Sequence, residues 1–98
     1  MVRRKLIWQK SAQKDRKEIF KYWNNKNKSN QYSKKLNSLF TEKTKTLKEF
    51  PYSGSKTNLE NIRVLVIENY LVLYEILNSE ILILRIFDGR RNPENFTK

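Results

Sequence analysis

The 98-residue sequence contains no cysteine and no histidine. The absence of cysteine excludes disulfides, thiol nucleophiles and thiolate-ligated metal sites. The absence of histidine excludes the Ser-His-Asp hydrolases and most zinc sites. Any enzyme activity would therefore have to move protons with carboxylates, lysine, tyrosine or water. The sequence also has no glycine-rich phosphate loop and no acidic cluster with metal-ligand spacing, so we expect neither a cofactor nor a metal.

Glycine, proline and long apolar runs are also scarce. Two glycines and two prolines in 98 residues are not typical of a linker or a low-complexity chain. The length suits a single domain, residues 1–98, with one modest core. The longest apolar runs, Val64–Ile67 and Ile81–Leu84, are too short to cross a bilayer, and no long apolar segment follows Arg3 and Arg4 as in a secretory signal. We expect a cytoplasmic protein without membrane contacts.

Positive charge is in large excess and unevenly spread. Lysine and arginine number 21 against 10 acidic residues, a net charge of +11, and residues 1–56 hold 16 of the basic residues but only 4 of the acids. Helix surfaces are often lysine-rich for solubility alone, but so large an excess on one half also suits binding to a polyanion, usually nucleic acid. The candidate nucleic-acid contacts are Lys34, Lys35, Lys45 and Lys48.

Two helical stripes of apolar residues follow a short strand predicted over residues 3–9. The stripe from Ala12 to Trp23 predicts a helix over about 11–25, with Ser11 as its N-cap. A second stripe, which starts at Tyr32, predicts a helix over about 30–49 that ends before Pro51. The side chains that we expect to be buried between the helices and a sheet are Phe20, Trp23, Leu39 and Phe40.

The second half of the chain has the composition of β-strands. Three runs rich in β-branched and aromatic residues predict strands at Ile62–Ile67, Tyr70–Leu77 and Glu80–Phe87, joined by two-residue turns. The order is therefore β-α-α-β-β-β. Hairpin-linked strands form a mainly antiparallel sheet, so we expect an α+β fold with both helices packed on one face.

Two-residue turns also predict the register of this sheet. Arg63 then lies opposite Tyr74, and Tyr74 lies opposite Ile83, with Val72 opposite Arg85. The face that we expect to pack against the helices is Ile62, Val64, Val66, Leu71, Leu73, Leu82, Leu84 and Ile86. The other face is Arg63, Leu65, Val72, Tyr74, Ile83, Arg85 and Phe87. If one of these turns had three residues instead of two, the side chains of the following strand would exchange faces. The second face is too apolar to be bare in water, so we expect a partner protein or a second copy to cover it.

The order of elements at this length resembles the RelE/ParE superfamily of bacterial toxins from type II toxin–antitoxin modules. The Pro–Gly turn at Phe50–Gly54, the hairpin around Asn69–Ile76 and the closing segment Ile83–Asn92 carry the resemblance. It implies a RelE/ParE-like fold and a cognate antitoxin as partner. It also implies one of two activities. RelE-like members cut mRNA on the ribosome through attack by a ribose 2′-hydroxyl, and ParE-like members poison DNA gyrase without catalytic chemistry.

We take a ribosome-dependent, metal-independent endoribonuclease as the first hypothesis, with the ribosome and mRNA as partners. Arginines stabilise the charge that develops on a phosphate under attack. The candidate catalytic residues are Arg63, Tyr74, Arg85, Arg90 and Arg91. The gyrase poison is the alternative, because Leu71, Asp88 and Phe96 stand where ribonuclease relatives carry an arginine, a histidine and a tyrosine. The sequence leaves enzyme activity open.

Overall fold

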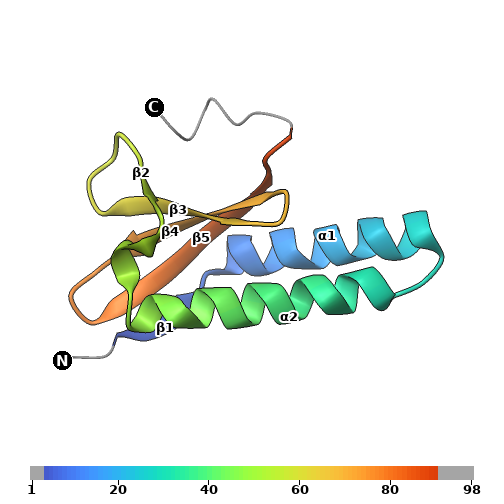
Figure 1. Cartoon of the computed structure of the whole chain (residues 1–98), viewed down its shortest axis with the longest axis horizontal. Helices are drawn as coiled ribbons and strands as arrows, with labels where there is room; N and C mark the ends of the chain where they lie inside the picture. Colours follow the sequence, from blue (N-terminus) through green and yellow to red (C-terminus); the bar gives the residue numbers. More distant parts are fainter. Residues whose placement is uncertain (1–3, 91–98) are drawn as a thin grey trace.

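The computed structural model describes residues 4–90, which form two helices against a five-stranded sheet (Figure 1). The elements are β1 (Lys5–Trp8), α1 (Lys10–Asn27), α2 (Gln31–Lys45), the 3-10 turns η1 (Thr46–Lys48) and η2 (Pro51–Ser53), β2 (Ser55–Lys56), β3 (Ile62–Ile67), β4 (Tyr70–Ile76) and β5 (Glu80–Asp88). The strand order is β1-β5-β4-β3-β2, with β1 parallel to β5 and every other pair antiparallel. The predicted α+β fold is confirmed. No helix among the described residues is long and apolar enough to span a membrane.

Helix α1 begins directly after β1. The backbone N–H of Gln9 continues the strand pairing by donating to the carbonyl of Ile83 at 3.0 Å, which keeps Gln9 extended as the N-cap. Ser11 therefore lies inside the helix, and its predicted capping role is wrong. No side chain caps this helix start.

Helix α2 is shorter than its apolar stripe predicts. The α-helix ends at Lys45, and residues 46–48 tighten into η1. The hydroxyl of Thr44 donates to the carbonyl of Phe40, and that of Thr46 donates to the carbonyl of Lys43. Such bonds compete with the regular helical pattern near its end. The short strand β2 follows, which the sequence did not reveal because two polar residues show no alternation.

The predicted hairpin register is correct up to a bulge. Arg63 lies opposite Tyr74, and Tyr74 lies opposite Ile83. A register shift between Leu73 and Tyr74 then leaves one extra residue in β5. As a result Val72 lies opposite Ile86, and the predicted pairing of Val72 with Arg85 is wrong. Beyond a bulge, alternation along the strand restarts on the other face.

The helices cover the face of the sheet that sequence analysis assigned to a partner. The strand residues that share the core with α1 and α2 are Ile67, Tyr70, Val72, Tyr74, Ile76, Ile81, Ile83 and Ile86. Of the set predicted for this face, only Ile86 is in the cluster, moved there by the bulge. The strand residues that alternate with these core residues face away from the helices. They are residues 62, 64, 66, 71, 73 and 82. Both faces of the sheet are apolar. The alternation of side chains along the strands therefore separates the two faces but does not show which one the helices cover.

Two tyrosines of the central strand β4 decide the choice of face. The Tyr70 hydroxyl accepts a hydrogen bond from the Trp23 indole of α1 at 2.7 Å. The Tyr74 hydroxyl donates to the carbonyl of Pro51 at 2.7 Å and accepts from the N–H of Gly54 at 3.0 Å. Buried hydroxyls need such partners, and only the helix side of the sheet supplies them.

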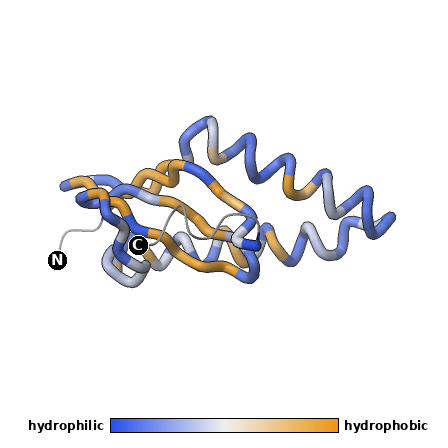
Figure 2. Tube along the Cα trace, turned by 90° about the horizontal axis from the view of Figure 1, so that it is seen from above, coloured by the Kyte–Doolittle hydropathy of each residue, from blue (hydrophilic) through white to orange (hydrophobic). Residues whose placement is uncertain are grey.

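Most of the core lies between the helices and the sheet, and the hydrophobic residues in Figure 2 are concentrated along the strands. Phe40 is fully buried, as predicted. Phe20, Trp23 and Leu39 are partly buried and pack against the same cluster. The helix pair extends past the edge of the sheet, so its far ends have only each other to pack against (Figures 1 and 2).

The opposite face of the sheet is open in places. Val66 is 57 % exposed and Ile7 is 37 % exposed. An apolar second face is therefore present, although its residues differ from the predicted set. Isolated apolar residues on a surface are ordinary, but a sheet face of this kind is typical of a contact surface.

We expect Tyr74→Phe to lower the free energy of unfolding by about 1–3 kcal/mol, because a carbonyl and an N–H of the η2 turn would lose their buried partner. Gly54 makes the site tight, since a Cβ there would lie 2.5 Å from the Tyr74 hydroxyl oxygen. Tyr52→Phe is the matched control, since Tyr52 is 62 % exposed and should change stability by less than about 0.5 kcal/mol. Equal effects of the two substitutions in denaturant unfolding would contradict the role of this hydroxyl.

Candidate functional site

The predicted catalytic residues fall into two separate groups. Arg63 and Tyr74 are register partners on β3 and β4, beside the turn that follows α2. Arg85 lies in the second half of β5, beside α1, and Arg90 lies just beyond the end of that strand. Arg91 lies outside the described residues. Within residues 4–90, the candidate catalytic residues therefore do not form one cluster.

In the first group, the side chains of Arg63 and Tyr74 hold the turn at residues 51–54. The Arg63 guanidinium donates to the carbonyls of Gly54 at 2.8 Å and of Tyr52 at 3.2 Å, and it lies 5.1 Å from the centre of the Tyr52 ring. Tyr74 is completely buried, and burial raises the pKa of its hydroxyl despite the N–H of Gly54 and the nearby Arg63. A neutral, buried phenol with both hydrogen-bond positions filled is a poor general base.

In the second group, Asp15 of α1 organises the end of β5. Its carboxylate accepts from the Arg85 guanidinium at 2.7 Å and from the backbone N–H of Ile86 at 2.9 Å. The Arg85 guanidinium also lies 5.0 Å from the centre of the Phe87 ring. The hydrogen bond to Asp15 raises the pKa of Arg85, so this side chain is a permanent cation. Asp15 thereby joins α1 to the part of β5 that no longer pairs with β1.

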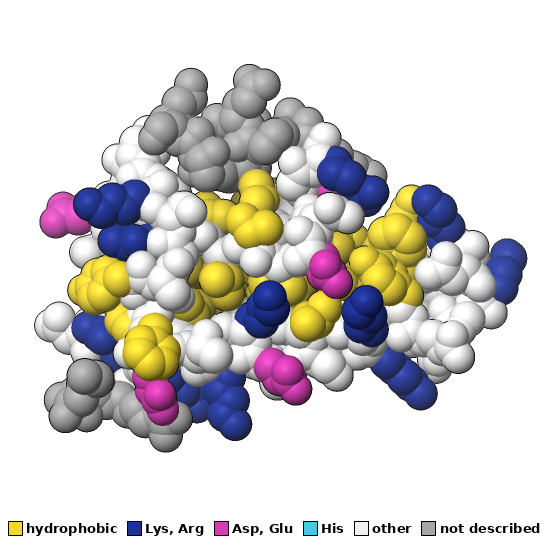
Figure 3. All heavy atoms as spheres, in the orientation of Figure 1, with side chains coloured by type: hydrophobic (Ala, Val, Ile, Leu, Met, Phe, Trp, Pro, Cys, Tyr) yellow, Lys and Arg dark blue, Asp and Glu magenta, His cyan; other side chains and the backbone are white. Residues whose placement is uncertain are grey.

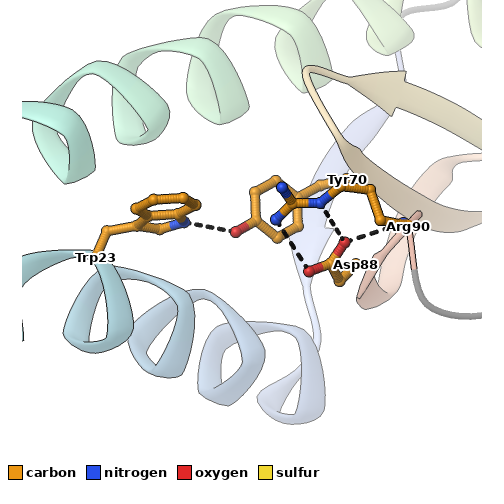
Figure 4. Close-up of polar contacts among 4 residues, drawn as sticks. All are labelled: Trp23, Tyr70, Asp88 and Arg90. Atoms are coloured by element: carbon orange, nitrogen blue, oxygen red, sulfur yellow. Dashed lines mark hydrogen bonds and ion pairs between the residues drawn. The ribbon is translucent and has the colours of Figure 1, made fainter. Parts of the chain in front are cut away.

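Asp88 and Arg90 form a second ion pair close to Tyr70 (Figure 4). The Arg90 side chain and its backbone N–H both donate to the Asp88 carboxylate, at 3.3 Å and 3.0 Å. The same hydrogen bond raises the pKa of Arg90. Burial raises the pKa of the Tyr70 hydroxyl, which the indole of Trp23 contacts from the other side. Tyr70 is therefore neutral at physiological pH and has its partner inside the fold.

A pocket of about 250 Å³ lies between α1 and the ends of β4 and β5. Its lining includes both aspartates of the chain, Asp15 and Asp88, together with Glu18 and the rings of Tyr22 and Tyr70. Such a lining offers acceptors and aromatic faces, which suit a donor or a cationic group. Both aspartates already have an arginine partner. Within residues 4–90, no group of three or more acidic side chains is arranged to hold a metal ion.

The predicted nucleic-acid contacts on α2 are only partly available. Lys34 and Lys45 are exposed, three helical turns apart on one side of α2. Lys35 lies 3.9 Å from the carboxylate of Glu68, and Lys48 is half-buried in η1. Their contact with nucleic acid stays a prediction. Figure 3 shows basic side chains over the helix pair, including its far end.

A denser basic row lies on α1. Lys10, Lys14, Lys17 and Lys21 are all exposed and fall within an arc of about 60° of the helix surface. Sequence analysis did not single them out, although their spacing of four, three and four residues is the signal of a common helix face. Like-charged pairs three or four residues apart destabilise a helix by about 0.2–0.5 kcal/mol each. This row contains three such pairs.

Comparisons with known proteins identify relatives of the whole domain. A family model described as the ParE toxin of the type II toxin–antitoxin system, parDE, matches residues 6–93. The solved structure titled "Chromosomal ParDE TA system from P. aeruginosa" has a similar fold, with a TM-score of 0.75 and 21 % sequence identity over 87 % of this chain and 95 % of that chain. At this identity the likeness shows the fold alone. A search of curated proteins found no match.

The contacts of Asp15 predict a difference between two substitutions. Asp15→Ala leaves the part-buried N–H of Ile86 without its partner, so we expect a loss of about 1–3 kcal/mol in the free energy of unfolding. Arg85→Gln removes only a pair whose arginine side chain is 47 % exposed, so we expect a loss below about 1 kcal/mol. Denaturant unfolding of both variants measures the difference. If Arg85→Gln cost as much as Asp15→Ala, the ion pair rather than the N–H contact would hold β5 to α1.

Proposed function

Since the family model covers residues 6–93, the chain belongs to the ParE toxin family of type II toxin–antitoxin systems, and we propose that it acts by binding and poisoning DNA gyrase, without catalytic chemistry of its own. The family match is the observation that carries this proposal. It favours the alternative activity over the ribosome-dependent endoribonuclease that we took as the first hypothesis.

The side chains chosen for chemistry support a binding function. An endoribonuclease needs groups free to take up a proton and to contact the phosphate under attack. Arg63 and Tyr74 instead bind the η2 turn, and Arg85 binds Asp15. Arg90 binds Asp88 in its own loop. These contacts give each of these four side chains a role in stabilising the fold. A toxin without catalytic chemistry would need the same contacts.

A cognate antitoxin is the partner that membership of a toxin–antitoxin family implies. We place its contact on the sheet face opposite the helices, where Val66 and Ile7 are exposed. A net charge of +11 favours an acidic or amphipathic antitoxin segment and speeds its association. Gyrase is the second partner, reached only when the antitoxin is absent.

We expect the purified chain to inhibit supercoiling of relaxed plasmid by DNA gyrase, and to leave mRNA intact in a translating ribosome extract. The two assays are run side by side with the same protein, because the two hypotheses predict opposite results. Cleavage of mRNA that depends on translation, with gyrase unaffected, would refute the proposal and restore the endoribonuclease.

Addition of the cognate antitoxin is the control for this experiment, and it should restore supercoiling. Val66→Asp adds a charge at the most exposed apolar residue of the proposed antitoxin contact. This variant should still inhibit gyrase, but more antitoxin should be needed to reverse the inhibition. Unchanged reversal by the antitoxin would move its contact away from this face of the sheet.

A further inference from the structure

The row of Lys10, Lys14, Lys17 and Lys21 on α1, here called the lysine row, carries four positive charges, and its only acidic neighbour three or four residues away on the helix is Glu18, beside Lys14 and Lys21. None of the four forms an ion pair within residues 4–90. The acidic residues of α1, Asp15 and Glu18, lie on the flank toward β5, where both act on the charge of Arg85. The core residues of α1, such as Ala12 and Ile19, lie on the other side of the helix.

The lysine row also breaks the local rules of helix electrostatics. Lys10, Lys14, Lys17 and Lys21 are neighbours at spacings where like charges repel. Lys10 stands in the first turn, where the helix dipole favours an anion, and that turn holds no acidic residue and no capping side chain. Solubility alone is usually served by interspersed charges of both signs. Glu18 offsets part of this repulsion at Lys14 and Lys21, whereas Lys10 and Lys17 have no acidic neighbour three or four residues away. Local rules that are only partly satisfied are expected at functional surfaces.

The geometry of the lysine row suits a regular track of phosphates. The four residues span about 16.5 Å along the helix axis, with intervals of about 6, 4.5 and 6 Å. A duplex presents about ten phosphates over that length, counting both strands. Packing of α1 against α2 and β5 fixes the row in place, so its charges are positioned before any partner arrives.

The lysine row has no exposed aromatic ring within its arc, because the exposed ring of α1, Tyr22, lies about 80° from Lys14 around the helix. Proteins that bind single strands combine a basic groove with exposed aromatic rings on which the bases stack. The residues beside the row, Gln13 and Asn24 among them, are polar, whereas Phe20 and Trp23 pack toward the core. The lysine row can therefore bind phosphates, but it has no group that would recognise a base.

We propose that the lysine row of α1 binds the phosphate backbone of duplex DNA without sequence preference. This surface is separate from the sheet face assigned to the antitoxin, and the proposal does not depend on gyrase as the target. It also differs from the α2 contacts, where Lys35 has an acidic neighbour and Lys48 is half-buried. Duplex DNA and duplex RNA share the backbone chemistry, and the experiment distinguishes them.

The test is the salt dependence of binding, measured for the purified full chain and fluorescent 20-base-pair DNA duplexes of two unrelated sequences. Each lysine–phosphate contact on duplex DNA contributes about 0.9 to the slope of log K against log salt concentration, so the row alone should contribute about 3.6. The triple variant Lys14→Gln, Lys17→Gln, Lys21→Gln should lower the slope by about 2.7, equally for both sequences.

The matched control removes the same charge from other exposed positions. The variant Lys5→Gln, Lys43→Gln, Lys56→Gln should change the slope by less than about 0.9, the contribution of one contact. Glutamine resembles lysine in helix propensity, and its introduction relieves repulsion in the row. The thermal midpoint of the row variant should therefore not fall below that of wild type. If it does, the single variant Lys17→Gln, with an expected slope change of about 0.9, decides the question.

Four results would overturn the proposal. The first is no binding of wild type to either duplex at about 50 mM salt, where backbone contacts are strong. The second is an equal slope for the row variant and wild type. The third is loss of antitoxin binding by the row variant while its duplex binding is unchanged, which would make the row a protein contact. The fourth is tighter binding of wild type to duplex RNA or to single-stranded DNA than to duplex DNA.

Discussion

The hydroxyl groups of Tyr70 and Tyr74 attach the central strand β4 to both parts of the helical layer, and the rest of the fold is arranged around them. Tyr70 binds Trp23 on α1, and Tyr74 binds the turn that follows α2. Each hydroxyl is buried with its ring and would be costly without its partner. These two contacts select the face of the sheet that the helices cover. They also leave Val66 exposed on the other face, where we propose the antitoxin contact.

Apart from β2, the order of elements and the boundaries of the main strands could be predicted from the sequence, because each depends on local patterns of apolar residues and turns. Strand β3 matches its prediction at both ends, and the hairpin at Glu68 and Asn69 has the predicted two-residue turn. The covered face could not be predicted, because both faces of β3 to β5 are apolar. The bulge opposite Leu73 has no local signal either, and it alone changes the partner of Val72.

The candidate site was less predictable than the fold, since it depends on which side chains meet. Arg63 and Tyr74 are close together as the register predicted, but their partners are backbone groups of the turn at Pro51 to Gly54. Asp15 was not singled out in the sequence, because Asp15 and Glu18, the two acids of a basic helix, form no pattern that points to a contact with a distant strand. Its carboxylate binds the Arg85 side chain and the N–H of Ile86, and these two contacts fix the position of Arg85 against α1. The strongest charge pattern of the chain is the row on α1, whose residues need no distant partner to form a common face.

The central claim is that Arg63 and Tyr74 hold the fold together and take no part in chemistry. The most direct test is to measure growth inhibition by the Arg63→Gln and Tyr74→Phe variants. The inhibition by each variant is divided by the fraction of that variant that is folded in the same cells. We predict that inhibition per folded molecule equals that of wild type within about twofold, whereas loss of a contact to a reacting phosphate typically lowers a rate about a hundredfold or more. A folded variant with inhibition reduced about a hundredfold would contradict the claim and make the altered side chain part of a catalytic site.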